Sequence, residues 1–443
     1  MYREKVEELI KWKKGRVRKP LILQGAKKVG KTYLMKDFAK NNYKNIIYIN
    51  LNPETQKTEI EEKLFKVLNK EKEIETIKIK IEEIINQEIE KDETVILLDE
   101  LEKSQNARKI LINMKQEEYI CDIIGTISNW GITLKEAELI KPKVNIVRIM
   151  PLNFYEFLLA SGEEELVKNL KEKNEEKIQE LNAKYKNELK KYIYIGGMPG
   201  IVENFLKNKN YPDVRKAQNE LIEEYEEQLE KAPTSVRENI IKIWDEMPLY
   251  IIREDKVLRY GDLRDGSNAT EYEPSIRYLE DMGLIYKVSR VDNIQFPISV
   301  YQDTTSFKLY YFDIGILSAK LNIPLSIILE EGKIFKIGNE ALSEQFVLQE
   351  LKSKLDMNIY FFKIENSLYE TNFIIQYKGK VYPMRIEIQK NVRDNTLIYL
   401  RKNFLANSCV HITPNTYKWH GWLTDIPLYM VENMPPYENR GEL

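Results

Sequence analysis

The chain has 443 residues, 43% of them hydrophobic, and its 68 Lys and Arg nearly balance its 70 Asp and Glu, giving a net charge of −2. This length predicts two to four domains with sizeable cores, and the small net charge argues against a nucleic-acid footprint over the whole surface. Two cysteines and two histidines are too few for a disulfide framework or a Cys- or His-based metal centre. Because no apolar run reaches membrane-spanning length and no signal peptide is visible, we expect a cytoplasmic protein without a membrane partner.

The N-terminal segment is amphipathic and basic. Residues 1–14 predict a helix, and residues 11–19 carry a run of Lys and Arg around one tryptophan. Such a run could touch nucleic acid, which would make nucleic acid a weakly supported partner. The commoner interpretation is a solvated helix end.

A phosphate-binding motif follows directly. Residues 25–32 fit GxxxxGK[ST], with an apolar strand pattern at residues 21–23 and a helix pattern at residues 32–40. In this context the backbone N–H groups of the loop and the start of the helix bind phosphates. We expect Lys31 to reach the β- and γ-phosphates of ATP and Thr32 to ligate Mg²⁺. The predicted ATP-binding residues are Gly25, Ala26, Lys27, Lys28, Val29, Gly30, Lys31 and Thr32.

A second motif ends in two acids. Residues 94–98 are an unbroken apolar run, typical of a buried parallel strand, and Asp99 and Glu100 follow. We expect Asp99 to hold Mg²⁺ through water and Glu100 to polarise the attacking water. The alternative is a core strand that ends in two solvated acids.

The first 150 residues alternate between strand and helix patterns. Strands are predicted at residues 45–51, 119–125 and 144–149, and helices at 57–90 and near 105–117. The fold class is therefore α/β, with a parallel sheet and right-handed crossovers.

The remaining chain divides into three parts. Residues 154–230 are helical with a break at 196–199, followed by helices at 235–250 and 271–282 and a hairpin at 284–291 and 298–301, as in a winged helix. Its third helix carries four acids and one arginine, so we expect it to pack on protein rather than read DNA. An α/β domain is predicted from 335, with a helix at 338–354 and strands at 359–363, 371–377, 380–388 and 408–413.

Together these segments resemble bacterial AAA-type P-loop ATPases that carry a C-terminal nuclease-like domain of the PD-(D/E)xK-related type. The resemblance rests on RKPLILQGAKKVGKTYLMKDF, LLDE, IIGT, PLNFYEFL, YIGGMPGIV, FKLYYFDIGIL and ALSEQFVLQEL. It implies a P-loop AAA-type ATPase core of the ASCE type (1–152), a helical lid (153–232), a winged-helix-like domain (233–330) and a restriction-endonuclease-like domain (331–443).

The resemblance also assigns single residues. Thr126 stands where a polar residue senses the γ-phosphate, with Ser128 and Asn129 as fallback candidates. No arginine finger can be assigned, and Arg148 is compatible with a simple surface pair.

The C-terminal domain departs from the nuclease pattern, which has an acid in a short strand and then E-x-K. Here Asn372 replaces the acid, Arg385 stands at the Glu position and Glu387 at the Lys position, and a register shifted to Glu387-Ile-Gln389 still lacks the lysine. A guanidinium in place of a carboxylate should expel a cation. We interpret the domain as a nuclease fold without nuclease chemistry. The alternative is a rearranged metal site that uses Glu370 and Glu387.

The predicted function is a nucleotide-driven conformational switch that uses ATP and Mg²⁺. The alternatives are an ATP-regulated nuclease and a slowly hydrolysing nucleotide-sensing scaffold. We expect an unidentified protein partner, and a homo-oligomer is compatible with the class.

Overall fold

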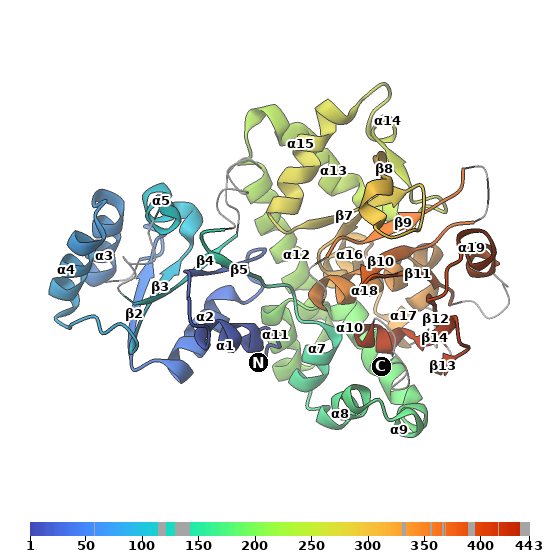
Figure 1. Ribbon diagram of the computed structural model, residues 1–443, viewed down its shortest axis with the longest axis horizontal. Coiled ribbons are helices and arrows are strands. Elements are labelled where there is room, and N and C mark those ends of the chain that lie inside the picture. Colours follow the sequence, from blue (N-terminus) through green and yellow to red (C-terminus); the bar gives the residue numbers. More distant parts are fainter. Residues whose placement is uncertain are drawn as a thin grey trace. The chain divides into compact units, whose positions relative to one another are not determined.

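The computed structural model describes residues 1–56, 58–113, 121–128, 142–329, 334–354, 357–365, 367, 369–388, 395–414 and 416–434 (Figure 1). These form two compact units. The first comprises Arg3–Met150 with Asp281–Gly283, and the second comprises Met1–Tyr2, Pro151–Glu280 and Leu284–Leu443. Of the described residues, no helix has the length and hydropathy needed to cross a bilayer.

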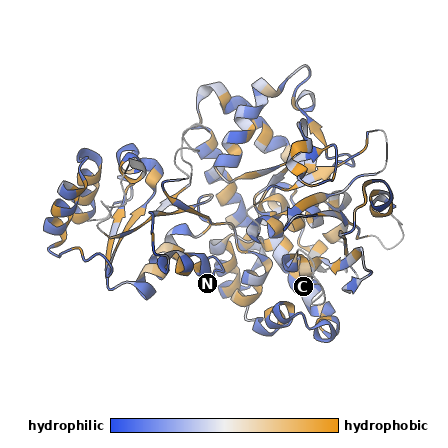
Figure 2. Ribbon diagram, in the orientation of Figure 1, coloured by the Kyte–Doolittle hydropathy of each residue, from blue (hydrophilic) through white to orange (hydrophobic). Residues whose placement is uncertain are grey.

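The first unit is built on a five-stranded parallel sheet, which confirms the predicted α/β class. The strand order is β2-β3-β4-β1-β5, so β4 separates the strand before the glycine loop from the strand that ends in the acids. All residues of β3 and β4 are buried, as their apolar runs predict, and Figure 2 shows hydrophobic residues along these strands. The strands are β1 (Leu21–Gln24), β2 (Asn45–Asn50), β3 (Thr94–Asp99), β4 (Asp122–Ile127) and β5 (Asn145–Arg148).

The helices of this unit include one correction to the sequence prediction. The single helix expected over residues 57–90 is two helices, because Glu71 takes an extended backbone after the first and Glu73 before the second. Both helices bury apolar residues in one shared core, so their similar composition hides the break. The helices are α1 (Val6–Lys13), α2 (Lys31–Asn42), α3 (Glu59–Lys70), α4 (Ile74–Ile85) and α5 (Gln105–Asn113).

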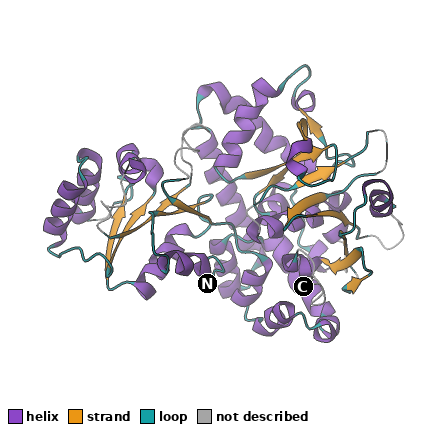
Figure 3. Cartoon of the chain, viewed as in Figure 1, coloured by secondary structure: helices purple, strands orange, loops and turns teal. Residues whose placement is uncertain are grey.

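The second unit begins with a run of helices, shown in Figure 3. The chain changes direction at Gly196 and Gly197, where a break was predicted. Gly196 has a φ of +81°, and a Cβ on Gly197 would lie 2.2 Å from the carbonyl oxygen of Leu152, so neither position accepts a larger residue without strain. The helices are α7 (Phe154–Ala160), α8 (Glu164–Glu172), α9 (Glu175–Glu180), α10 (Asn182–Ile195), α11 (Pro199–Asn208), α12 (Tyr211–Leu229) and α13 (Thr234–Ile252).

A nine-stranded mixed sheet forms the rest of this unit, in the order β13-β14-β12-β11-β10-β9-β7-β8-β6. Strand β7 pairs in parallel with β9, so one sheet contains strands from before and after residue 330, where we predicted a domain boundary. The strands are β6 (Leu258–Arg259), β7 (Ile285–Val291), β8 (Gln302–Tyr311), β9 (Tyr360–Phe362), β10 (Phe373–Tyr377), β11 (Lys380–Ile386), β12 (Cys409–Thr413), β13 (Lys418–Trp419) and β14 (Leu423–Pro427). The helices beside it are α14 (Tyr260–Leu263), α15 (Ala269–Asp281), α16 (Ile314–Lys320), α17 (Ser326–Leu329), α18 (Ile337–Lys354) and α19 (Thr396–Phe404).

The predicted hairpin is wrong in its second arm. Residues Ile298–Tyr301 form a short 3₁₀ helix, and the strand that pairs with β7 is β8, from Gln302 onward. The first residues of β8 are polar and mostly exposed, so they lack the alternation that would mark a strand in the sequence.

Candidate active site

The glycine loop lies between β1 and α2, and its backbone requires its glycines. A Cβ on Gly25 would lie 2.1 Å from the carbonyl oxygen of Ile149. Gly30 caps α2 with a φ of +95°, in the left-handed region that favours glycine. The loop therefore leads directly into the first turn of α2, where backbone N–H groups can stabilise an anion.

Lys31 is held inside this loop. Its Nζ donates hydrogen bonds to the carbonyl oxygens of Gly25 and Ala26, both at 2.8 Å, and to Ser128 Oγ at 3.1 Å. Burial lowers the pKa of Lys31 to about 8, although the Glu102 carboxylate opposes this shift. The ammonium is thus placed at the loop by three oxygen acceptors.

Asp99 joins three elements of the sheet unit. Its Oδ1 accepts hydrogen bonds from Thr32 Oγ1 on α2 at 2.9 Å and from Thr126 Oγ1 on β4 at 2.5 Å. Its Oδ2 accepts from Tyr48 Oη on β2 at 2.8 Å, and only 4% of the residue is exposed. The structure therefore brings together three predicted site residues. A hydroxyl and a carboxylate are the oxygen ligands that Mg²⁺ prefers beside substrate phosphates, so these residues fit a magnesium ion.

Glu100 follows Asp99 with a φ of +58°, an uncommon conformation for a residue other than glycine. Its Oε2 accepts from the Asn52 amide at 3.1 Å, and its backbone N–H donates to Thr126 Oγ1 at 3.0 Å. Burial, followed by the charges of Glu102 and Asp99, raises the pKa of its carboxyl group. A raised pKa suits a group that accepts a proton from water.

The sequence predicts a strand that ends at Gly125, with Thr126 directly after it, and this strand boundary is wrong. Strand β4 runs from Asp122 to Ile127, so Thr126 lies within it. Its hydroxyl therefore has a fixed direction towards β3. Asn129 lies outside the described residues, and Arg148 is exposed at the end of β5.

Several side chains of this site were missed from the sequence. Tyr48 and Asn52 come from β2 and the segment after it, and they contact both acids. Arg3, 5% exposed, donates from Nη1 to the carbonyl oxygen of Val29 at 2.8 Å and so supports the loop. Only the polar residues at the end of the predicted second strand gave a signal for any of these contacts.

The strand order, the glycine loop and the acids at the end of β3 define a P-loop nucleoside triphosphatase. Residues 17–158 match the family model described as an AAA domain, which supports an AAA-type P-loop ATPase in this segment. Residues 186–326 match a second family model, described as a domain of unknown function, DUF8612.

Comparison with solved structures lists the RuvB Holliday junction branch migration motor of Thermotoga maritima. It is 15% identical, with a TM-score of 0.27, over 65% of this chain and 89% of that chain. Comparison with curated proteins finds no match.

The three predicted nuclease positions lie where β10 begins and β11 ends. Asn372 directly precedes β10, and its Oδ1 accepts from the Ile386 N–H at 2.9 Å and from Arg385 Nη1 at 3.3 Å. Asn372 and Arg385 are therefore neighbours. Glu387 is bound instead to the next strand, where its Oε2 lies 2.9 Å from His411 Nε2.

Glu370 and Glu387, the pair in the alternative metal site, have separate partners. Glu370 accepts from Lys308 Nζ at 2.5 Å and lies 3.5 Å from Lys363 Nζ, whereas Glu387 contacts His411. Within the described ranges, no group of three or more His, Cys, Asp and Glu is arranged to hold a metal ion.

A buried ion network surrounds Glu344 of α18. This carboxylate, 1% exposed, accepts from Lys256 Nζ at 2.5 Å and Tyr310 Oη at 2.6 Å, and Lys308 Nζ lies 3.5 Å away. Burial opposes its ionisation, but Lys256 and Lys308 hold the pKa of Glu344 well below its usual range. Burial would likewise lower the pKa of Lys308, but Glu370 and Glu344 raise it. Lysine side chains of the chain itself therefore neutralise these carboxylates.

Both histidines of the chain lie in one cluster. His411 Nδ1 is 3.0 Å from Asp425 Oδ1, and His420 Nε2 is 2.8 Å from Asp425 Oδ2. The other ring nitrogen of His411 faces Glu387, so when both carboxylates are ionised both ring nitrogens donate, which is the imidazolium form. Burial disfavours this charge, but Asp425 and Glu387 raise the pKa of His411. Nothing in the sequence pattern indicated this cluster.

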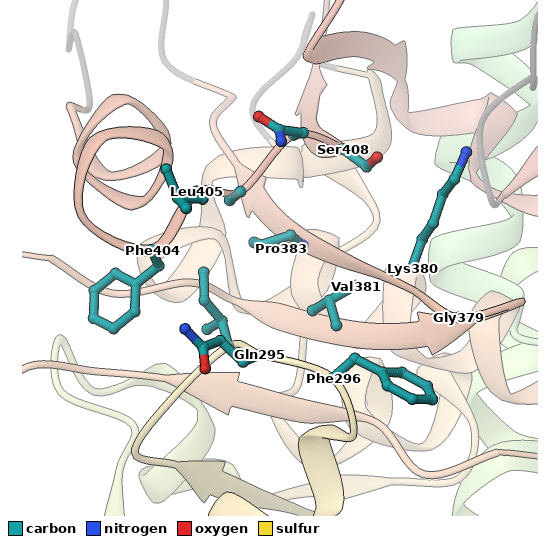
Figure 4. A pocket seen from close by; sticks show the side chains of 12 residues that line it. Gln295, Phe296, Gly379, Lys380, Val381, Pro383, Phe404, Leu405 and Ser408 are labelled. Carbon is teal, nitrogen blue, oxygen red and sulfur yellow. The ribbon is translucent and has the colours of Figure 1, made fainter.

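A separate pocket of about 270 Å³ lies beside the β10–β11 hairpin and the end of α19 (Figure 4). Its lining includes apolar Phe296, Val381 and Leu405 and polar Lys380. None of the predicted site residues lines it, so it takes no part in the chemistry above.

Proposed function

We propose that this chain is a magnesium-dependent ATP hydrolase whose nucleotide state drives a conformational change. The observation that carries the proposal is that Thr32 and Thr126 both donate to Asp99 Oδ1. The glycine loop and the central strand β4 thereby share one carboxylate, so a phosphate that displaces either hydroxyl alters the other.

Each residue has a distinct role in this proposal. Lys31 and the loop N–H groups bind the phosphates, and Thr32 and Asp99 would hold Mg²⁺, which supplies a Lewis acid that offsets phosphate charge. Glu100 accepts a proton from the attacking water. Thr126 orients Asp99 and the Glu100 backbone.

A nucleotide-sensing scaffold with slow turnover is the second candidate, and one observation favours it. The Asn52 amide holds the Glu100 carboxylate, whose backbone is already in an uncommon conformation. If the Glu100 carboxylate must break this hydrogen bond before it can accept a proton from water, ATP hydrolysis is slow.

The second unit would transmit the nucleotide state. The series α13, β6, α14, α15, β7, β8, with antiparallel order β6-β8-β7, supports a winged helix. The acids Glu271 and Glu273 on its third helix pair with Arg264 and Lys287, which favours protein packing over DNA contact. The preceding helices α7–α12 would be the lid. The boundaries 1–152, 153–232, 233–330 and 331–443 remain proposals.

The nuclease-like assignment rests on the series α18, β9, β10, β11, α19, β12. In this series β9 and β11 are antiparallel to β10, and β12 is parallel to β11. Asn372, Arg385 and the internal cations around Glu344 and Glu370 favour a domain that does not cut nucleic acid. It would serve as an interaction surface for a protein partner.

Nucleotide binding is tested by calorimetry on the full chain and on Lys31→Ala. The variant loses a charge-assisted contact to phosphate, which is worth roughly 2 kcal/mol or more. Weak or absent ATP binding by Lys31→Ala, with tight binding by the wild type, supports the proposal. Equal affinities would reject it.

A further inference from the structure

Asp99 has a third hydrogen-bond donor that the motif does not supply. Tyr48 Oη, on edge strand β2, lies 2.8 Å from Asp99 Oδ2, whereas the two threonine hydroxyls share Oδ1. Each carboxylate oxygen therefore has its own donor, and together the donors hold the carboxylate against rotation.

The tyrosine ring is itself held in place. Lys36 Nζ lies 3.6 Å from the centre of the Tyr48 ring, in cation–π geometry. Lys36 is one helical turn after Thr32 on α2, and Tyr48 is about half-buried between α2 and β3. The phenol is thus fixed between the helix that carries Thr32 and the strand that carries Asp99.

A donor of this kind changes how well a carboxylate serves a metal. Groups that hydrogen-bond to a metal-binding carboxylate set its orientation, and their removal typically costs about 10- to 100-fold in metal affinity or activity. Oδ1 of Asp99 already accepts two hydrogen bonds from the threonines. Tyr48 therefore orients the carboxylate through its other oxygen, Oδ2.

We propose that Tyr48 is a positioning residue for magnesium binding. Its hydroxyl orients Asp99 through Oδ2, so that ATP binds more tightly with Mg²⁺ than without it. This inference rests on the proposed function. It assigns β2, which lies outside both motifs, a specific part in that function.

The chain offers a matched pair of substitutions. Tyr48→Phe removes only the hydroxyl that donates to Asp99. Tyr43→Phe removes a hydroxyl that donates to Asp122 Oδ2 at 2.7 Å, at the other end of the same sheet. Both variants keep the ring, and thermal melting followed by circular dichroism shows whether each folds.

The experiment measures ATP affinity by calorimetry, once with excess Mg²⁺ and once with EDTA. For Tyr48→Phe we expect unchanged affinity in EDTA and about a tenfold smaller gain of affinity from Mg²⁺. For Tyr43→Phe both affinities should equal those of the wild type. The half-activating Mg²⁺ concentration for hydrolysis should rise about tenfold in Tyr48→Phe, with kcat at saturating Mg²⁺ within about twofold.

Two results would overturn the inference. One is a Tyr48→Phe variant with the magnesium dependence of the wild type. The other is an equal loss of affinity with and without Mg²⁺, which would mean that Tyr48 supports the loop rather than the metal. A wild type that binds no ATP at all would instead reject the proposed function, and the inference with it.

Discussion

Thr126 Oγ1 lies 2.5 Å from Oδ1 of Asp99, and the same hydroxyl accepts the backbone N–H of Glu100. One threonine on β4 thus contacts both acids at the end of β3. This relationship requires that β4 lie directly beside β3, which is the observed strand order.

Replacing Thr126 by Val keeps the shape of the side chain and removes the hydroxyl. We expect ATP affinity measured without Mg²⁺ to stay within a few-fold, because no contact to the glycine loop is lost. Hydrolysis should fall on the order of 100-fold, as when one preorganised donor is removed from an active site. Thr126→Ser should restore most of the rate in a phosphate-release assay, and a Val variant with full turnover would remove Thr126 from the mechanism.

Lys308 should be required for the stability of the second unit. Lys308→Met leaves the buried Glu344 and the partly buried Glu370 short of one positive charge, which should cost about 3–5 kcal/mol of unfolding free energy. The matched control is Lys363→Met, since Lys363 also faces Glu370 but is more exposed, and it should cost about 1 kcal/mol or less. Urea denaturation compares the two, and equal losses would contradict the ion network.

His411 gives a pH dependence whose sign follows from its raised pKa. The stabilisation by His411 is fully present below its unfolded pKa of about 6.5 and is lost as pH rises through the folded pKa. His411→Gln should therefore destabilise the protein more at acidic than at alkaline pH, down to the range where Asp425 itself is protonated. The control is His420→Gln, which leaves the His411 imidazolium between its two carboxylates.

NMR can check this assignment directly, because the chain has only two histidines. The His411 ring signal should titrate above about pH 6.5. Titration below that value would contradict the doubly bonded imidazolium.

The C-terminal domain should not cut nucleic acid. Asn372 offers a neutral amide, and the neighbouring Arg385 offers a positive charge, so neither favours a divalent cation. Purified full-length protein should leave single- and double-stranded DNA and RNA intact with Mg²⁺ or Mn²⁺, with and without ATP. Cleavage that persists on repurification and disappears in Glu387→Ala would restore the nuclease hypothesis.

The sequence could indicate which residues meet at the candidate site, because these residues belong to two local motifs. Lys31, Thr32, Asp99 and Glu100 each follow a strand pattern, and parallel strands bring such ends together. Tyr48 could not be found this way, since its contact with Asp99 spans 51 residues and depends on the pairing of β2 with β3.

The ion network and the histidine cluster were out of reach for the same reason. Lys308 meets Glu344 and Glu370 only after β8 joins the sheet that α18 covers, and the start of β8 has no alternating pattern. His411 meets Asp425 across parallel strands β12 and β14. Charged residues at these positions look like solvated surface until the fold brings them together.

The most direct test of the account compares ATP binding and ATP turnover in the wild type and in Glu100→Gln. Glutamine keeps the size of the side chain but cannot take up a proton from water. The account predicts that Glu100→Gln binds ATP as the wild type does and that its rate of phosphate release falls on the order of 100-fold or more. Unchanged turnover in this variant would contradict the assignment of Glu100, and with it the hydrolysis mechanism proposed for this chain.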